Sequence, residues 1–329
     1  TRDRDRWRDR DRDRWRGRDR DRHRHRNRDG DGLSDWEMFG LGALSAVAVG
    51  AVIYGAQEVL SNDGERIVTR DPQGDYHVYR DDDALIRRAG STVSASSRDD
   101  GLVASVLTHQ DGTRVHTLRD ADGRVLSRRV ERPNAAPVTL FDDTAREPAP
   151  PPATPRPRSP VVIDYDERTS PDLLYGAFDT DPPAAETGRY SLSQIRDEAA
   201  LRYLAPEISL ASVAFPSGSA AMPPDDAASL APLGDAMRYM IERDASEVFL
   251  IEGHSDAPGD GAANLLLSDR RAESVARTLT ANFGVPAENI VFQGYGESDM
   301  RERTTRASEV NRRVVIRRIT PLLAEPPAG

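Results

Sequence analysis

Two opposite charges in the C-terminal third of the chain have types and spacing suited to chemistry. Asp256 follows a short apolar run at 247–253, and Arg271 lies within a helical pattern over 264–283. Because strand, loop and helix follow one another directly, the carboxylate and the guanidinium can face one pocket. Such a pair can hold a zwitterion, with an ammonium on Asp256 and a carboxylate on the fork of Arg271. The alternative is that Asp256 caps its loop and Arg271 forms a solvated salt bridge.

The predicted helix carries a polar flank beside its buried face. Asn264, Ser268 and Arg271 stand at i, i+4 and i+7, which places them on one side of a helix. The apolar positions needed for burial follow a separate stripe. That stripe contains Leu265, Ala272, Ala276, Leu279 and Phe283.

The sequence argues against an enzyme. His254, Ser255 and Asp256 are adjacent at the end of a strand, where successive side chains point to opposite faces, so they cannot form a hydrogen-bonded triad among themselves. The chain has no cysteine, which excludes thiolate metal sites, and it has no phosphate-cradling glycine motif. We therefore expect no catalysis, no cofactor and no metal. Three histidines lack a fourth metal ligand and are interpreted as surface residues: His77, His109 and His116.

The pattern around these residues alternates strand and helix. Apolar strands are expected at 208–215, 247–253, 289–292 and 313–319, and helices at 192–204, at 264–283 and around Leu230 to Ile241. Ser191 and Gln194 form a capping box ahead of the first helix. Pro232 either kinks its helix or moves the start later. The sequence predicts an α+β domain, an α/β sandwich of order β-α-β-α-β-β, over residues 189–329.

Three ordered motifs resemble a known family. The run GHSDAPGDGAANLLLSDRRAESV, then GYGES at 294–298 and NRRVVI at 311–316, is similar to the OmpA C-terminal-like domain, shared with Pal and MotB. The resemblance covers about residues 206–321. The family's His-Thr-Asp stands here as His-Ser-Asp at 254–256, and its Asn-x-x-Leu-Ser-x-x-Arg-Ala motif is matched from Asn264 to Ala272. The segment FPSGSAAM at 215–222 lacks the family's usual Asp-rich form.

The resemblance implies the OmpA-like fold and non-covalent binding of peptidoglycan through the meso-diaminopimelate of a Gram-negative peptide stem. Asp256 and Arg271 would grip the amino and carboxylate groups, and Asn264 would assist. Arg312 and Arg313 either line the same groove or brace the last strand. The binding site expected from the resemblance comprises Asp256, Arg271, Asn264, Ser255, Ser268 and Arg312.

The implied function is that of a cell-envelope protein that tethers a membrane to the cell wall. The OmpA-like domain would lie in the periplasm, with outer-membrane association favoured and an inner-membrane anchor as the alternative. A second hypothesis is a structural protein whose middle region or Gly-rich segment binds a protein partner or another copy of itself, with the C-terminal domain as anchor.

The N-terminal third contains two unusual segments. Residues 1–37 form a low-complexity arm in which Arg occupies every even position from Arg2 to Arg28, largely alternating with Asp, and we expect it to be disordered. The arm could attract anionic lipid or nucleic acid, but the formal net charge of the whole chain, -10, argues against nucleic acid. Residues 38–56 form a run of nineteen residues without a formal charge, close to the roughly 20 residues needed to cross a bilayer. They predict a membrane helix, or else a buried or oligomerising one.

The middle of the chain is marked by turns and prolines. Asp100-Gly101, Asp111-Gly112, Asp122-Gly123 and Pro133-Asn134 recur every eleven residues within 62–145. Asp-Gly suits the positive φ angles of tight hairpins, so we expect a small β-meander with strands near 102–109, 113–119, 124–131 and 137–141. Residues 146–188 are interpreted as a linker, because seven prolines fall within 147–160.

Overall fold

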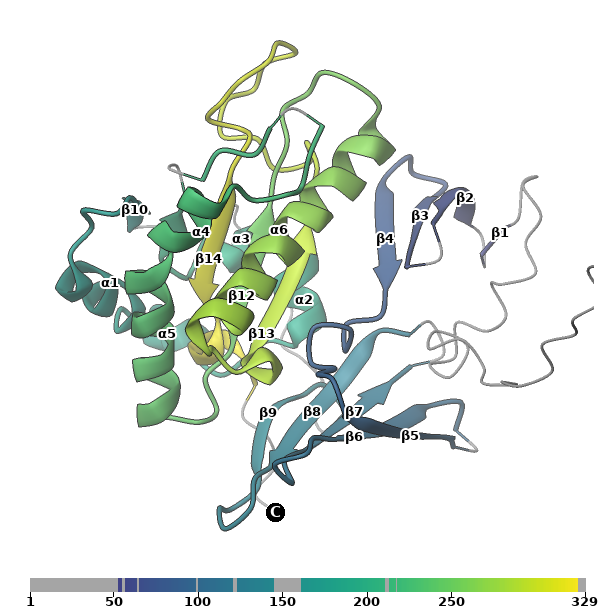
Figure 1. Ribbon diagram of the computed structural model, residues 1–329. Coiled ribbons are helices and arrows are strands. Elements are labelled where there is room, and N and C mark those ends of the chain that lie inside the picture. Colours follow the sequence, from purple (N-terminus) through teal and green to yellow (C-terminus); the bar gives the residue numbers. More distant parts are fainter. Residues whose placement is uncertain are drawn as a thin grey trace, which may run out of the picture. The chain divides into compact units, whose positions relative to one another are not determined.

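The computed structural model describes residues 53–54, 57–63, 65–98, 100–120, 123–144, 161–210, 213–216 and 218–324 (Figure 1). Within these ranges the strands form three sheets. Their orders are β1-β2-β3-β4, β5-β6-β7-β8-β9 and β10-β11-β14-β12-β13. The predicted arm at 1–37 lies outside the described residues.

The first sheet begins inside the segment predicted to be a membrane helix. Ile53–Tyr54 form strand β1 and pair antiparallel with the start of β2. The prediction of a helix reaching residue 56 is wrong at this point, because the backbone pairs in an antiparallel ladder instead. Residues 38–52, 55 and 56 lie outside the described part, and none of its helices has the length and apolar character of a membrane span. The other strands are β2 (Gln57–Asn62), β3 (Arg66–Arg70) and β4 (Tyr76–Arg80).

The predicted β-meander is confirmed. Its glycine turns have the left-handed backbone that Asp-Gly favours, with φ of 82° at Gly101, 85° at Gly112 and 80° at Gly123. Asn134 adopts φ 61° at the fourth turn. The strands are β5 (Thr92–Ser97), β6 (Val103–Thr108), β7 (Arg114–Arg119), β8 (Val125–Glu131) and β9 (Val138–Asp142). Strand β5 has only two apolar residues, Val93 and Ala95, which is why only the other four strands were predicted.

The third sheet has the predicted β-α-β-α-β-β order at its centre. Strand β14 lies between β11 and β12 and is antiparallel to both, whereas β12 and β13 are parallel. The α+β prediction is confirmed. The elements are β11 (Glu207–Ser209), α4 (Pro224–Ser229), α5 (Ala231–Arg243), β12 (Phe249–Gly253), α6 (Gly261–Phe283), β13 (Ile290–Gly294) and β14 (Val314–Arg318).

Helix starts and ends follow local capping chemistry. Pro232 occupies the first turn of α5, so the proline moves the start later and does not kink the helix. Ser191 and Gln194 form the predicted capping box, but the helix divides into α2 (Leu192–Asp197) and α3 (Ala199–Arg202). Short 3-10 turns lie at Ala184–Glu186, Ala287–Asn289 and Thr320–Leu322.

The second half of the expected linker is ordered, which corrects the prediction of low order up to about residue 188. Strand β10 (Val162–Asp164) pairs parallel with β11, and helix α1 (Pro171–Phe178) contacts α5. Ser170 caps α1 and Pro171 starts it, and Phe178 then packs edge-on against Phe249 at a ring-centroid distance of 5.2 Å. Because of the high proline content just upstream, this short strand and helix were not predicted from the sequence.

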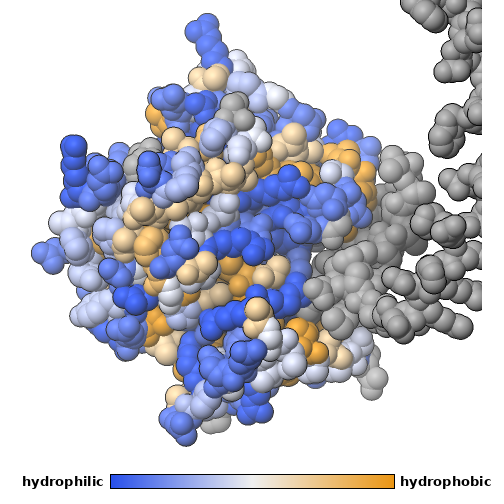
Figure 2. Space-filling view, in the orientation of Figure 1, coloured by the Kyte–Doolittle hydropathy of each residue, from blue (hydrophilic) through white to orange (hydrophobic). Residues whose placement is uncertain are grey.

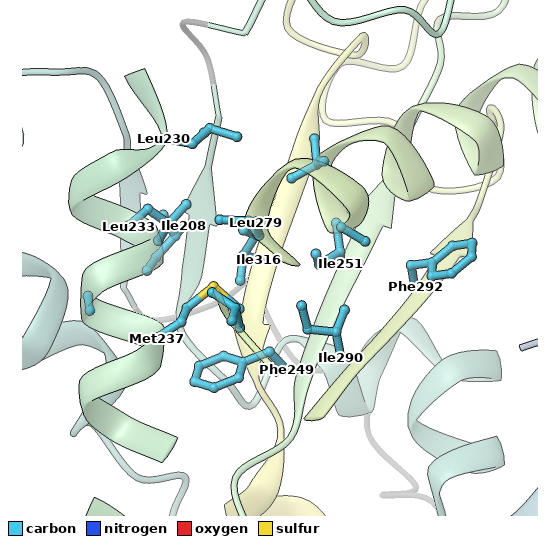
Figure 3. Packing of buried hydrophobic residues seen from close by; sticks show 14 of the residues in the cluster. Ile208, Leu230, Leu233, Met237, Phe249, Ile251, Leu279, Ile290, Phe292 and Ile316 are labelled. Atoms are coloured by element: carbon cyan, nitrogen blue, oxygen red, sulfur yellow. The ribbon is translucent and has the colours of Figure 1, made fainter. Parts of the chain in front are cut away.

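The core lies on both faces of the third sheet. Helices α5 and α6 cover one face, where Met237 and Leu279 pack among strand residues (Figures 1 and 3). Helices α2 and α3 and the meander strands β8 and β9 contribute to the core on the other face, where Phe141 joins Leu250 and Ile195. The surface seen in Figure 2 is mostly hydrophilic, with hydrophobic residues in scattered groups.

Candidate functional site

The candidate site is built where the end of β12 meets α6 and the turn after β13. Glycines allow this close approach, because a Cβ on Gly253 would lie 1.9 Å from the carbonyl oxygen of Ser268. The backbone N–H of Ser255 donates to the carbonyl of Gly296 (2.8 Å), and that of Tyr295 donates to Gly253 (2.8 Å). These bonds fix the direction in which Asp256 leaves the sheet.

Asp256 is held by the turn that precedes β14. Its Oδ2 accepts from Arg312 Nη1 (2.7 Å) and from the backbone N–H of Ser308 (3.1 Å). Arg312 remains 37% exposed, so this ion pair faces solvent. The neighbouring Arg313 is buried and donates to the carbonyl of Asp299 (3.1 Å). Arg312 therefore lies at Asp256, whereas Arg313 braces the last strand.

Arg271 is buried against the segment that departs from the family pattern. Its Nε donates to the carbonyl of Ser219 (3.0 Å) and Nη2 donates to Pro216 (3.3 Å), and the guanidinium lies 5.3 Å from the ring centroid of Phe215. Burial lowers the pKa of Arg271, the charge of Arg312 lowers it further, and the charge of Asp256 raises it.

The three charges of the site therefore act on one another. No ion pair of Arg271 with a carboxylate is found among the described residues, so the solvated salt bridge considered above is not what the structure shows. These contacts of Arg271 could not be predicted from the sequence, because the acceptors are backbone carbonyls, which every residue type has.

Asn264 supports the loop that carries Asp256. Its side-chain amide donates to the backbone carbonyls of Asp256 (3.3 Å) and Pro258 (3.2 Å) and to Oε2 of Glu297 (3.2 Å). The structure thus brings Asp256, Arg312 and Asn264 into direct contact around one loop. The role of Glu297 was not foreseen from the sequence, although it lies in the GYGES motif.

Two of the expected site residues point into the protein. Ser268 is fully buried, donates to the carbonyl of Leu265 (2.8 Å) and accepts from the N–H of Gly296 (2.9 Å). The hydroxyl of Ser255 is also buried and has no hydrogen-bond partner in the part of the chain that is described. Ser268 therefore joins α6 to the turn after β13. The hydroxyl groups of Ser255 and Ser268 are both buried, so neither is exposed to solvent beside the Asp256 loop.

A second cluster beside the site has the composition of a metal centre. Ligand atoms of Glu252, His254 and Asp299 lie within 4.8 Å of one another. However, Glu252 accepts from Arg317 Nε (2.8 Å) and Asp299 accepts from Arg202 Nη2 (3.3 Å). Guanidinium groups thus occupy the carboxylate oxygens that a cation would need, and the cluster fits a buried ion-pair network.

The same network predicts a loss of stability in mild acid. Burial and the charge of Arg313 lower the pKa of His254 from 6.5 to about 4, although Glu252 and Asp299 oppose this. The unfolded chain then binds more protons than the folded one between those pH values, so stability present above pH 6.5 is lost as the pH falls towards 4. At about 1.4 kcal/mol per pKa unit the loss approaches 3 kcal/mol.

Urea unfolding at pH 7, 5.5 and 4 checks this expectation. We expect His254→Gln to unfold with a flatter pH dependence than the parent. Glu252 also has a lowered pKa, but its contribution is lost only below its unfolded value of 4.5. An unchanged slope in the variant would show that another group controls acid stability.

The first sheet is joined to α6 by a buried carboxylate. Asp269 accepts from Arg66 Nε (2.9 Å), from Arg80 Nη1 (2.7 Å) and from the N–H of Gly294 (2.9 Å). Arg80 also lies 4.1 Å from the ring centroid of Phe292. One side chain thus links two strands of the first sheet to the end of β13, next to the candidate site.

Comparison with known proteins identifies the family of the segment that carries this site. Residues 214–314 match the model of the OmpA family. This segment is an OmpA domain. The match confirms the resemblance carried by the three motifs, and it includes Asp256, Arg271 and Arg312.

Curated relatives match about a quarter of the chain. The chain is 44% identical over 81 residues to the outer-membrane lipoprotein YfiB of Pseudomonas aeruginosa, which is 24% of this chain and 47% of that protein. It is 37% identical over 87 residues to outer membrane protein A of Serratia odorifera, which is 26% of this chain and 35% of that protein. The chain therefore spans less than half the length of these two relatives.

Solved structures give matches over a similar share of the chain. The cell wall anchor of the T6SS from Pseudomonas aeruginosa is 27% identical with a TM-score of 0.29, covering 36% of this chain and 80% of that one. The peptidoglycan-associated lipoprotein from Burkholderia pseudomallei is 24% identical with a TM-score of 0.27, covering 32% of this chain and 87% of that one.

Proposed function

We propose that this chain is a cell-envelope protein that binds peptidoglycan non-covalently and anchors a membrane to the cell wall. The family match of the OmpA domain supports this, as do relatives whose names place them at the outer membrane or the cell wall. The observation that carries the proposal is the ion pair of Asp256 with Arg312, together with Arg271, which lies near enough for both charges to shift its pKa.

The proposed ligand group is the side chain of meso-diaminopimelate, which carries one ammonium and one carboxylate. Asp256 would accept the ammonium, since its carboxylate is only part-buried and meets solvent beside Arg312. Arg271 would receive the carboxylate, because its buried charge is solvated by backbone carbonyls and pairs with no acid among the described residues. An anion placed there gains a charge-assisted contact at little further desolvation cost.

Asn264 and Arg312 would have supporting roles. Asn264 holds the carbonyls of Asp256 and Pro258, so it keeps the loop in place before the ligand arrives. Arg312 shares Asp256 with the incoming ammonium and can itself contact an anionic part of the stem. We place the domain in the periplasm and favour association with the outer membrane, as its curated relatives suggest.

Co-sedimentation of the full chain with purified diaminopimelate-type sacculi tests the proposal. We expect Asp256→Ala and Arg271→Ala each to weaken binding by tenfold or more, because each removes one end of the zwitterion clamp. Matched controls are Asp235→Ala and Arg238→Ala, an exposed ion pair on α5 (2.9 Å), which should bind like the parent. Thermal melts of all four variants verify folding. Full binding by folded variants of both Asp256 and Arg271 would reject the site.

A further inference from the structure

A second concave site lies between the first sheet and the OmpA domain. Its volume is about 740 Å³, within the range of small-molecule sites. Tyr76 and Tyr79 of β4 line one wall, and Arg196 of α2 and Glu297 line the other. Neither the family match, which begins at residue 214, nor the clamp at Asp256 accounts for a cavity walled by β4.

The charges in this cavity largely offset one another. Arg196 pairs with Asp82 (2.9 Å), and Arg80 is held by Asp269 (2.7 Å). The lining also contains two neutral amides, Gln57 and Gln293, and four further charged residues: Asp75, Arg124, Asp197 and Glu297. Such a lining does not concentrate positive charge as a phosphate or nucleic-acid site would. It suits a ligand that is rich in hydroxyl groups and carries few charges.

Tyr76 supplies an aromatic surface to this cavity. Its side chain is 36% exposed, and its ring rests on the start of α6, where a Cβ on Gly261 would lie 2.6 Å from it. The ring of Tyr295 is instead covered, by the guanidinium of Arg202 at 3.9 Å and by the stacked ring of His254. Tyr76 therefore combines an apolar ring with a polar tip, a surface that matches the C–H face and hydroxyl rim of a sugar ring.

One hydrogen-bonded pair of residues links the cavity to the clamp. Glu297 lines the cavity and accepts from Asn264 (3.2 Å), which in turn holds the carbonyl of Asp256. We propose that the cavity binds carbohydrate, namely the glycan strand whose peptide stem occupies the Asp256 site. This inference rests on the proposed function, because it assigns a second part of the same polymer to the same protein.

Binding of two separate probes to the full chain tests the inference. The probes are glycan strands freed of their peptides and meso-diaminopimelate itself, each titrated by calorimetry or by NMR line broadening. We expect the parent to bind the glycan strands, and Tyr76→Ala to weaken that binding at least tenfold. Ser193→Trp, which fills the cavity from α2, should do the same. Tyr239→Ala, an exposed tyrosine of α5, should have no effect.

The outcomes separate this inference from the proposed function. Asp256→Ala should lose meso-diaminopimelate and keep the glycan strands, and folded Tyr76→Ala should show the reverse. A parent protein that binds sacculi and meso-diaminopimelate but not peptide-free glycan overturns the carbohydrate site alone. Glycan binding that survives both Tyr76→Ala and Ser193→Trp also overturns the site. Failure of the parent to bind sacculi would overturn the proposed function.

Discussion

Replacing Asp269 with alanine should lower the free energy of unfolding by about 3–5 kcal/mol, as removal of one partner from a buried ion pair does. The carboxylate is fully buried and accepts from the guanidinium groups of Arg66 and Arg80, which are themselves buried. Without Asp269, the buried positive charges of Arg66 and Arg80 are less well neutralised, and the N–H of Gly294 loses its acceptor. Urea unfolding followed by circular dichroism measures the change.

Two further variants make this expectation specific. Asp269→Asn keeps an oxygen for the N–H of Gly294 but removes the charge, so it isolates the electrostatic part of the loss. Asp235→Ala deletes a carboxylate that is 63% exposed and should change stability by less than about 1 kcal/mol. If Asp269→Ala were as mild as Asp235→Ala, the first sheet would not depend on this carboxylate for its attachment to α6.

Gly253→Ala should destabilise the protein by about 3 kcal/mol or more, an effect in the upper range for single substitutions. The added Cβ would lie 1.9 Å from the carbonyl oxygen of Ser268, and this neighbour is helix backbone that cannot swing away. Helix α6 and strand β12 would have to separate, which would also disturb the bond between Ser255 and Gly296. Thermal and urea unfolding of the variant check the loss.

Gly176→Ala is the matched control for this substitution. Gly176 lies within α1, and a Cβ there meets nothing within 4 Å. Because alanine is the better helix former, this variant should be more stable by up to about 1 kcal/mol. A Gly253→Ala protein as stable as the parent would mean that the spacing of β12 and α6 is looser than the structure shows.

The sequence predicted the parts of the fold that local chemistry determines. Asp-Gly turns at regular spacing gave the meander, because the positive φ of Gly101 and Gly112 is a property of the residues themselves. The helix and strand periods over 207–319 gave the third sheet for a similar reason. Strand β10 was missed because its partner is distant in sequence, as the pairing of Val162 with Glu207 shows.

The candidate site shows the same division. Helical spacing placed Asn264 and Arg271 on one helix, and the strand end gave Asp256, but spacing could not show which side chains turn inward. Ser268 lies on the predicted polar flank, yet it is buried because it accepts from the N–H of Gly296. The choice between Arg312 and Arg313 also needed tertiary contacts, since only the structure shows which one meets Asp256.

The position of Asp143 changes how the proline-rich residues 145–160 should be understood. Its carboxylate accepts from the N–H of Leu192 (2.9 Å) and Ser193 (3.3 Å), while Val162 pairs in the third sheet. Both boundaries of the segment are therefore fastened to the same body, and its length sets no distance between the meander and the OmpA domain. Contacts outside the segment, at Asp143 and Val162, therefore hold both of its ends in one body.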